Sequence, residues 1–278
     1  MSIVRWAGSA AMIYNIQVAR CIGMFVVLAY HGQDLLTRFY DTEPTMPRFL
    51  HGAIDMFFVA SGFIMFHILR DGDRTPYQFL ADRFIRVYPI YWLTTTLFVA
   101  LYLIGLQPAF VSQINFDDFL HSMALIPDIR ADGRRAMIVE QAWTLIFEMY
   151  FYILLGLSLF LGSQLRSLIA LTVIFGMGPI ILHYTDMLPM PLEYVLRPIT
   201  LEFVAGGVLA MLYRQPIALP KRAWVMMGWA SLLGGLAIMM FWSVRYEWAV
   251  WSNFEIRVVA FGIPATMVVA GLLLLEKG

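Results

Sequence analysis

The sequence predicts an all-α protein, a polytopic bundle of about eight transmembrane helices. Of its 278 residues, 60% are hydrophobic and 14% are charged, and the mean hydropathy is +0.73. Soluble domains contain about 25% charged residues, so this composition does not supply the polar groups that a water-exposed surface needs. Apolar stretches of about 20 residues, the length that crosses the hydrocarbon core of a bilayer, follow one another along the chain. We therefore expect residues 1–278 to form a single membrane-embedded domain.

The eight expected spans are bounded by charged residues, proline or glycine. The first contains Arg20 in its middle and has no small-residue cleavage site behind it, so we interpret it as a retained span rather than a secretory signal. The longest connection, residues 107–137, contains an apolar run at 119–126 that is too short to cross and is expected at the interface. The spans cover residues 12–31, 52–69, 87–106, 138–162, 165–184, 195–213, 223–244 and 254–275.

The distribution of basic residues predicts a cytoplasmic N-terminus, because lysine and arginine are in excess in cytoplasmic loops. The N-terminal side holds ten of them: Arg5, Arg70, Arg74, Arg83, Arg86, Arg166, Arg214, Lys221, Arg222 and Lys277. The opposite side holds six: Arg38, Arg48, Arg130, Arg134, Arg135 and Arg245. With eight spans the C-terminus returns to the cytoplasmic side.

Several classes of function are excluded by what the sequence lacks. Its 19 basic and 19 acidic residues balance, so there is no basic excess for nucleic acid. Cys21 is the sole cysteine, and neither an H-E-x-x-H motif nor a ligand cluster is present, so we expect no metal site. No phosphate-binding loop and no G-x-G-x-x-G motif supports nucleotide hydrolysis or dinucleotide chemistry.

Six charged residues lie within the expected spans, where each costs on the order of 2.5–3.5 kcal/mol on insertion scales. They are Arg20, Asp55, Glu148, Arg197, Glu202 and Arg257. We expect all of them to face the interior of the bundle. For Arg197, Glu202 and Arg257 the structural interpretation is favoured: they pair with one another and fix helix packing.

Arg20 and His31 are predicted to lie on one face of the first helix. Eleven residues correspond to roughly 1,100° of rotation, about 20° from three full turns, and to roughly 16 Å along the axis. A histidine takes a hydroxyl proton near neutral pH, and a buried arginine binds an anionic or carbonyl oxygen. A histidine at the end of a span is also commonly an interfacial residue, and both interpretations stay open.

Two further groups are candidates for chemistry. Arg83 and Arg86, three residues apart beside the third span, form a pair that suits a phosphate group, although arginines there are ordinarily positive-inside anchors or lipid contacts. Glu148 follows Trp143 in an aromatic stretch, where a carboxylate must pair or stay protonated. It is a candidate to orient His31 or Arg20.

These residues together resemble the acyltransferase 3 family of integral-membrane O-acyltransferases. Arg20 to His31 resembles the family's R-x10-H helix, and residues 52–64, which include Asp55 and Ser61, resemble its G-x-D-x-F-F-V-x-S-G-F segment. Residues 83–92 are similar to R-x-x-R-x-x-P-x-Y-W, and Trp143 to Tyr152 to W-T-L-x-x-E-x-x-F-Y. Leu201-Glu202-Phe203 with Gly206 resembles a later L-E-F-x-x-G helix.

The resemblance implies a transferase that moves an acyl group, usually acetyl, from cytoplasmic acyl-CoA to a hydroxyl of a carbohydrate. The branch most similar to this chain acetylates bacterial exopolysaccharide in the inner membrane. Carried over by motif, His31 is the catalytic base, Arg20 its partner in the acyl path, and Glu148 an orienting group. Arg83 and Arg86 hold the CoA phosphates, while Asp55, Ser61 and Trp143 give support. Acyl-CoA is a co-substrate, and no permanently bound cofactor is expected.

One departure from the family bears on activity. Family members usually have about ten spans and close with an L-G-x-x-S-Y-S-x-Y-L-x-H segment, which this sequence does not contain. The resemblance therefore implies that the last one or two family helices are missing. The alternatives are a truncated inactive member and a transporter or flippase for a sugar-linked substrate, because intramembrane charges also mark substrate paths.

Overall fold

The computed structural model describes residues 13–40, 43, 45–70, 72, 74–106, 114–127, 137–185, 188–245 and 254–278, without the side chains of residues 35 and 38. All regular secondary structure in these residues is helical, which confirms the predicted all-α class. The start of the first expected span, Met12, and four residues of the orientation argument lie outside the described residues. Those four are Arg5, Arg130, Arg134 and Arg135.

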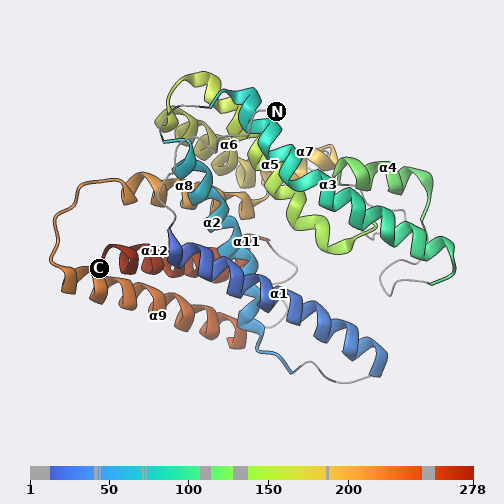
Figure 1. Cartoon of the computed structure of the whole chain (residues 1–278), viewed down its shortest axis with the longest axis horizontal. Helices are drawn as coiled ribbons and strands as arrows, with labels where there is room; N and C mark the ends of the chain where they lie inside the picture. Colours follow the sequence, from blue (N-terminus) through green and yellow to red (C-terminus); the bar gives the residue numbers. More distant parts are fainter. Residues whose placement is uncertain are drawn as a thin grey trace, which may run out of the picture. The chain divides into compact units, whose positions relative to one another are not determined.

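The helices succeed one another along the whole described chain (Figure 1). The α-helices are α1 (Tyr14–Tyr40), α2 (Gly52–Ile68), α3 (Pro76–Leu103), α4 (Phe116–Ala124), α5 (Trp143–Ser158), α6 (Gln164–Tyr184), α7 (Met190–Leu196), α8 (Leu201–Tyr213), α9 (Lys221–Arg245), α11 (Phe254–Arg257) and α12 (Ile263–Lys277). The short helices are η1 (Arg48–His51), η2 (Glu140–Ala142), η3 (Leu159–Leu161), η4 (Pro198–Thr200) and the π-helical turn η5 (Val258–Gly262).

Among the described residues, six of the eight expected spans correspond to helical segments that are long and apolar enough to cross a membrane, and a seventh corresponds to a bent pair of helices that qualifies only when the pair is counted as one span. Six are single segments: Arg48–Ile68, Pro76–Leu103, Glu140–Leu161, Gln164–Tyr184, Lys221–Arg245 and Phe254–Lys277. The seventh combines Met190–Leu196 with Pro198–Tyr213. The eighth expected span falls on α1, which has 27 residues but is not in this group. α4, at the short apolar run, has nine residues and is too short to cross, as expected.

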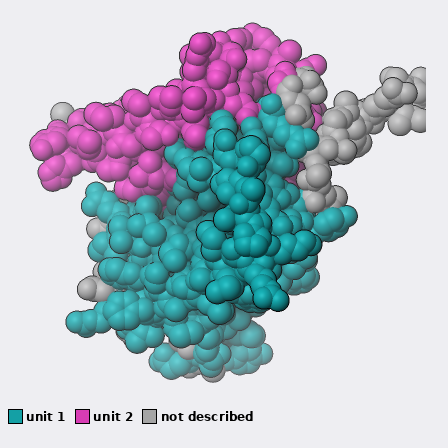
Figure 2. All heavy atoms as spheres, turned by 90° about the vertical axis from the view of Figure 1, so that its left-hand side faces the viewer, with its two compact units in different colours: residues 1–71, 202–278 teal, residues 72–201 magenta. Residues whose placement is uncertain are grey.

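The chain divides into two compact units, coloured separately in Figure 2. Unit 1 consists of Met1–Asp71 and Glu202–Gly278, and unit 2 of Gly72–Leu201. The expectation that residues 1–278 form a single domain without the last family helices stays a prediction.

In unit 1, glycines let helices approach until their backbones touch. A Cβ on Gly62 of α2 would lie 2.0 Å from the carbonyl oxygen of Phe203 in α8, and a Cβ on Gly206 would lie 2.0 Å from that of Val59. α9 and α12 pack side by side in the same way, since a Cβ on Gly271 would lie 2.7 Å from the carbonyl oxygen of Gly228 (Figure 1). Small residues at such crossings are typical of membrane helices.

The start of α1 is held by the end of α12. The carboxylate of Glu276 accepts hydrogen bonds of 3.0 Å from the backbone N–H groups of both Tyr14 and Asn15. The Asn15 side chain in turn donates to the carbonyl oxygen of Leu272. A carboxylate at a helix N-terminus satisfies its unpaired N–H groups and is favoured by the helix dipole.

In unit 2, α3 packs against α5 and α4. The aromatic residues of the R-x-x-R-x-x-P-x-Y-W segment donate hydrogen bonds to the last carbonyl groups of α4. Tyr91 Oη donates to Ser122 O (2.7 Å) and Trp92 Nε1 to Met123 O (2.8 Å). The last carbonyl groups of a helix have few intrahelical partners, and here Ser122 O accepts from the Leu125 N–H (3.0 Å) as well as from Tyr91. Part of this motif therefore fixes structure.

Candidate active site

The first candidate residues lie on α1 in unit 1. The helix runs without a break through both Arg20 and His31, so the two side chains project from one face, as their spacing predicts. Both side chains are half-buried. Arg20 lies close to Ala53 and Phe57 of α2, where Gly23 allows the helices to approach. α1 therefore presents Arg20 and His31 from a helix that is anchored on α2.

Asp55 is completely buried in unit 1 and pairs with Arg257. Arg257 donates from Nε to Oδ1 (3.0 Å) and from Nη2 to Oδ2 (2.6 Å), a bidentate arrangement between residues 202 positions apart. Glu202, also buried, lies against Asp55. We expected Arg197, Glu202 and Arg257 to pair with one another, but Arg257 pairs with Asp55, with Glu202 beside this pair, and Arg197 pairs with Glu193 in unit 2 at 2.5 Å. A local i,i+4 pair explains this difference, because the carboxylate lies one helical turn away.

Ser61 is a buried residue of α2 next to Gly62, at the crossing with α8. The supporting role that the motif implies for Ser61 stays a prediction. His51, at the end of η1, is a residue that the sequence did not single out. Its ring centroid lies 3.5 Å from that of Tyr30, and it interacts electrostatically with both His31 and Arg257. His51 lies four residues before Asp55 in the sequence, and this spacing could have indicated that the two residues are neighbours on one helical face.

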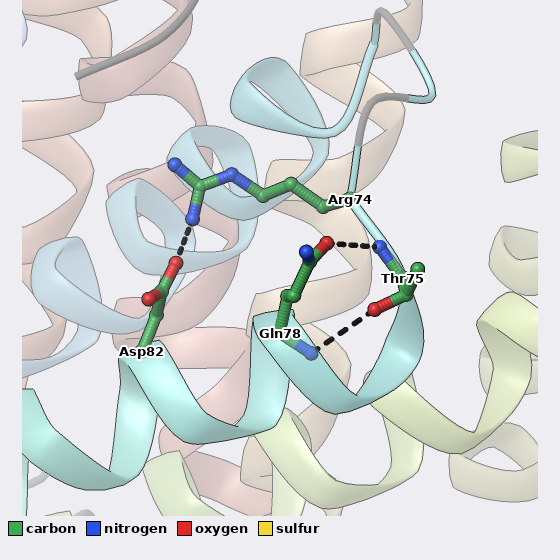
Figure 3. A network of polar contacts seen from close by, with 4 residues as sticks. All are labelled: Arg74, Thr75, Gln78 and Asp82. Carbon is green, nitrogen blue, oxygen red and sulfur yellow. Dashed lines mark hydrogen bonds and ion pairs between the residues drawn. The ribbon is translucent and has the colours of Figure 1, made fainter. Parts of the chain in front are cut away.

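The start of α3 in unit 2 is fixed by a capping box (Figure 3). The hydroxyl of Thr75 accepts a hydrogen bond from the Gln78 backbone N–H (3.3 Å), and Gln78 Oε1 accepts one from the Thr75 N–H (3.0 Å). Arg74 forms an ion pair with Asp82 across the same turn. These contacts fix the first turns of the helix that carries Arg83 and Arg86.

Arg83 and Arg86 lie one turn apart on α3 but differ in burial. Arg86 is exposed, whereas Arg83 is 8% exposed. The Arg83 guanidinium carbon lies 5.8 Å from the centre of the Phe79 ring and 5.9 Å from that of Tyr152 on α5. Contacts with aromatic faces stabilise a cation.

Glu148 belongs to the same cluster. Tyr152 Oη, one turn further along α5, donates a hydrogen bond of 2.5 Å to Glu148 Oε1. Tyr152 therefore links Glu148 to Arg83. Trp143, at the start of α5, packs edge-on against Phe147, with 5.9 Å between ring centroids. The structure thus brings together two sequence motifs that lie about sixty residues apart.

The candidate residues fall into two groups. Arg20, His31, Asp55 and Ser61 belong to unit 1, and Arg83, Arg86, Trp143 and Glu148 to unit 2. That Glu148 orients His31 or Arg20 stays a prediction. Within the described residues, no three histidine, cysteine, aspartate or glutamate side chains come together as a metal site.

The apolar helices and these two clusters define an integral membrane protein with polar groups inside its helical units. Residues 13–277 match the family described as "Acyltransferase domain", and the chain belongs to this family.

Two curated proteins are similar to the chain. "Exopolysaccharide production protein ExoZ" of Rhizobium meliloti (strain 1021) is 34% identical over 217 residues, which cover 72% of this chain and 63% of that protein. "Protein 2 in picA locus" of Rhizobium radiobacter is 44% identical over 62 residues, which cover 19% of this chain and 32% of that protein. The chain thus spans less than two thirds of either relative. No solved structure matches it.

Proposed function

We propose that the protein is an integral-membrane O-acyltransferase of exopolysaccharide biosynthesis. It transfers an acyl group, acetyl in the first instance, from acyl-CoA to a hydroxyl of a carbohydrate precursor. The family supports acyl transfer, and the name of the relative from Rhizobium meliloti supports exopolysaccharide as the pathway. We further propose the bacterial inner membrane as the location, with the N-terminus in the cytoplasm.

The observation that carries the proposal is that a protein of this family contains both a histidine-bearing helix, in unit 1, and a helix with two arginines, in unit 2. His31 projects from α1 on the same face as Arg20. Arg83 and Arg86 lie one turn apart on α3, with Arg83 held between two aromatic rings. An imidazole suits the removal of a hydroxyl proton, and guanidinium groups suit phosphate.

In the proposed reaction, His31 takes the proton of the acceptor hydroxyl and the oxygen attacks the carbonyl carbon of the thioester. The C–O bond forms, the C–S bond breaks, and the proton passes from His31 to the departing CoA sulfur. Arg83 and Arg86 hold the CoA phosphates. Arg20 guides the acyl group, because the roughly 16 Å rise along α1 separates it from His31. Glu148, through Tyr152, keeps Arg83 in place.

The test is release of the free CoA thiol from acetyl-CoA by the purified protein in detergent, with and without a polysaccharide extract. We expect extract-dependent release that is lost in His31→Ala and that requires higher acetyl-CoA in Arg83→Ala. His183→Ala is the matched control, because His183 is an exposed histidine of unit 2. Extract-dependent release that survives in folded His31→Ala would contradict the role of His31. No release from the folded parent with any extract would overturn the proposed activity and favour the transporter alternative.

A further inference from the structure

Three charged side chains meet in the interior of unit 1, on α2, α8 and α11. Asp55, Glu202 and Arg257 are 0%, 2% and 3% exposed. Arg257 uses two nitrogens on the two oxygens of Asp55, so this pair is satisfied by itself. A buried ion pair is tolerated where the geometry is bidentate and the charges balance. Glu202 therefore adds a second carboxyl group beside a single cation.

Glu202 lies in hydrogen-bonding contact with Asp55. Among the described residues, no group donates a hydrogen bond to either of its carboxyl oxygens. Two ionised carboxylates have only acceptors and cannot bond to each other, whereas a protonated carboxyl donates. An ionised carboxylate without a donor is also very costly to bury. Both arguments place one proton between Asp55 and Glu202, which leaves the three groups with no net charge.

The backbone around Glu202 is shaped for this contact. Val258–Gly262 is a π-helical turn directly after Arg257. A Cβ on Gly262 would lie 2.6 Å from Glu202 Oε1, so only glycine leaves room for the carboxyl group. π-helical turns inside α-helices occur frequently at functional sites.

One residue, His51, lies between this group of charged side chains and the candidate base His31. His51 precedes Asp55 by one helical turn and interacts electrostatically with Arg257 on one side and His31 on the other. Its ring also lies against that of Tyr30, the neighbour of His31. His51 therefore lies between the two groups: it interacts electrostatically with Arg257, which binds Asp55, and its ring contacts Tyr30 on the segment of α1 that carries His31.

We propose that Asp55 and Glu202 share one proton, and that this neutral centre, with Arg257 and His51, is a positioning network for His31. The inference that Asp55 and Glu202 share a proton does not depend on the proposed activity. The positioning role rests on the proposed function, because His31 is the proposed base.

The proton is tested by infrared spectroscopy of the purified protein, since a protonated carboxyl group has a carbonyl band distinct from that of a carboxylate. We expect this band in the parent and its loss in Glu202→Gln. Glu193→Gln is the matched control, because Glu193 is ion-paired with Arg197. The glutamine is nearly isosteric with a protonated glutamate, so Glu202→Gln should also keep the parent's melting temperature. A band absent from the parent, or unchanged in Glu202→Gln, would overturn the shared proton.

The positioning role is tested in His51→Gln, with His183→Gln as the control. We expect kcat to fall about ten- to a hundredfold with an unchanged KM for acetyl-CoA, because a small displacement of a catalytic group has effects of this size. The rate at which diethyl pyrocarbonate modifies His31, followed by peptide mass spectrometry, should also change several-fold. An unchanged kcat and an unchanged modification rate in a folded variant would overturn the positioning role.

The second measurement also separates this proposal from the proposed function. A parent that transfers no acyl group contradicts the proposed function alone, because the modification rate of His31 still reports its interaction with His51. A change in that rate in His51→Gln then supports the network, and an unchanged rate overturns it.

Discussion

The two units hold their buried arginines in different ways. In unit 1, Arg257 is 3% exposed and bound by both oxygens of Asp55. In unit 2, Arg83 is held by the faces of Phe79 and Tyr152, beside the exposed Arg86. In unit 1 the Arg257 guanidinium is thus paired with a carboxylate inside the protein. The arrangement in unit 2 uses rings, which carry no formal charge, and keeps a basic pair one turn apart on α3.

This difference separates a structural charge from a candidate ligand-binding charge. A bidentate carboxylate neutralises an arginine, so a phosphate group gains little from approaching it. An arginine against ring faces gains a favourable contact that does not occupy it with a bidentate carboxylate. The comparison is therefore between a guanidinium bound by both oxygens of a carboxylate and one that lies against two aromatic rings. Four predictions test the comparison, from the largest expected effect to the smallest.

The largest effect is expected from Asp55→Asn, which leaves Arg257 buried without the carboxylate that binds it through both oxygens. Breaking a buried pair by removing one partner costs about 3–5 kcal/mol. The matched variant in unit 2 is Asp82→Asn, whose ion pair with Arg74 is half-exposed, with side chains 47% and 30% accessible. Exposed pairs contribute about 0–1 kcal/mol. Denaturant unfolding in detergent micelles measures both variants, and similar losses would contradict the distinction between the two pairs.

The second prediction compares two glycines. Gly62→Ala places a Cβ 2.0 Å from a backbone oxygen of α8 in unit 1, whereas Gly156→Ala in unit 2 meets the side chain of Leu80 at 2.6 Å. A side chain changes its rotamer more easily than a helix backbone moves. We expect Gly62→Ala to lower the free energy of unfolding by at least the 1–3 kcal/mol of ordinary overpacking, and Gly156→Ala by less. Equal melting temperatures of the Gly62→Ala and Gly156→Ala variants would show that α2 and α8 can move apart without a loss of stability.

The sequence predicted the parts of the site that lie on one helix or in one motif. The eleven-residue spacing of Arg20 and His31 predicts a shared face, and α1 is continuous through both. Apolar stretches predicted six of the helical segments that can cross a membrane, and a seventh when the bent pair is counted as one span, because length and composition alone determine that property. Both features depend only on residues that are near one another in the sequence, so the sequence alone predicts them.

Contacts between distant segments were not predictable in the same way. Asp55 and Arg257 lie 202 positions apart, and their pairing depends on how α2 and α11 pack. Glycines likewise allow the close crossing of α2 with α8, yet a glycine in a sequence does not identify the atom it will approach. In the sequence Tyr152 is only the last residue of a motif, yet its hydroxyl bonds Glu148 while its ring lies against Arg83. An aromatic residue in an apolar stretch shows no sign of its hydrogen bond.

The third prediction concerns that hydroxyl. Tyr152→Phe keeps the ring face that contacts Arg83 but removes the hydrogen bond to Glu148. A hydrogen bond to a charged group contributes about 1.5–3 kcal/mol, and this one is only part-buried, so we expect a loss near the lower end. The KM for acetyl-CoA should rise several-fold with little change in kcat. Tyr77→Phe, at an exposed tyrosine of α3, is the control. A fall in kcat alone would assign Tyr152 to the chemical step instead of to Arg83.

The smallest effects are expected at the starts of the two helices that carry the candidate residues. Thr75→Ala removes the hydroxyl that caps α3 and should cost about 1 kcal/mol. Glu276→Gln keeps one of the two acceptor oxygens at the start of α1 and removes the other together with the negative charge, which is worth about 0.3–1 kcal/mol at a helix N-terminus. The two losses should respond differently to salt. The Glu276→Gln loss should shrink at high ionic strength because the charge is near the surface, whereas the Thr75→Ala loss should stay constant because no charge is involved. If both losses shrink in parallel, Thr75 stabilises α3 through the neighbouring Arg74–Asp82 ion pair, and the difference between the two units then lies in their interiors alone.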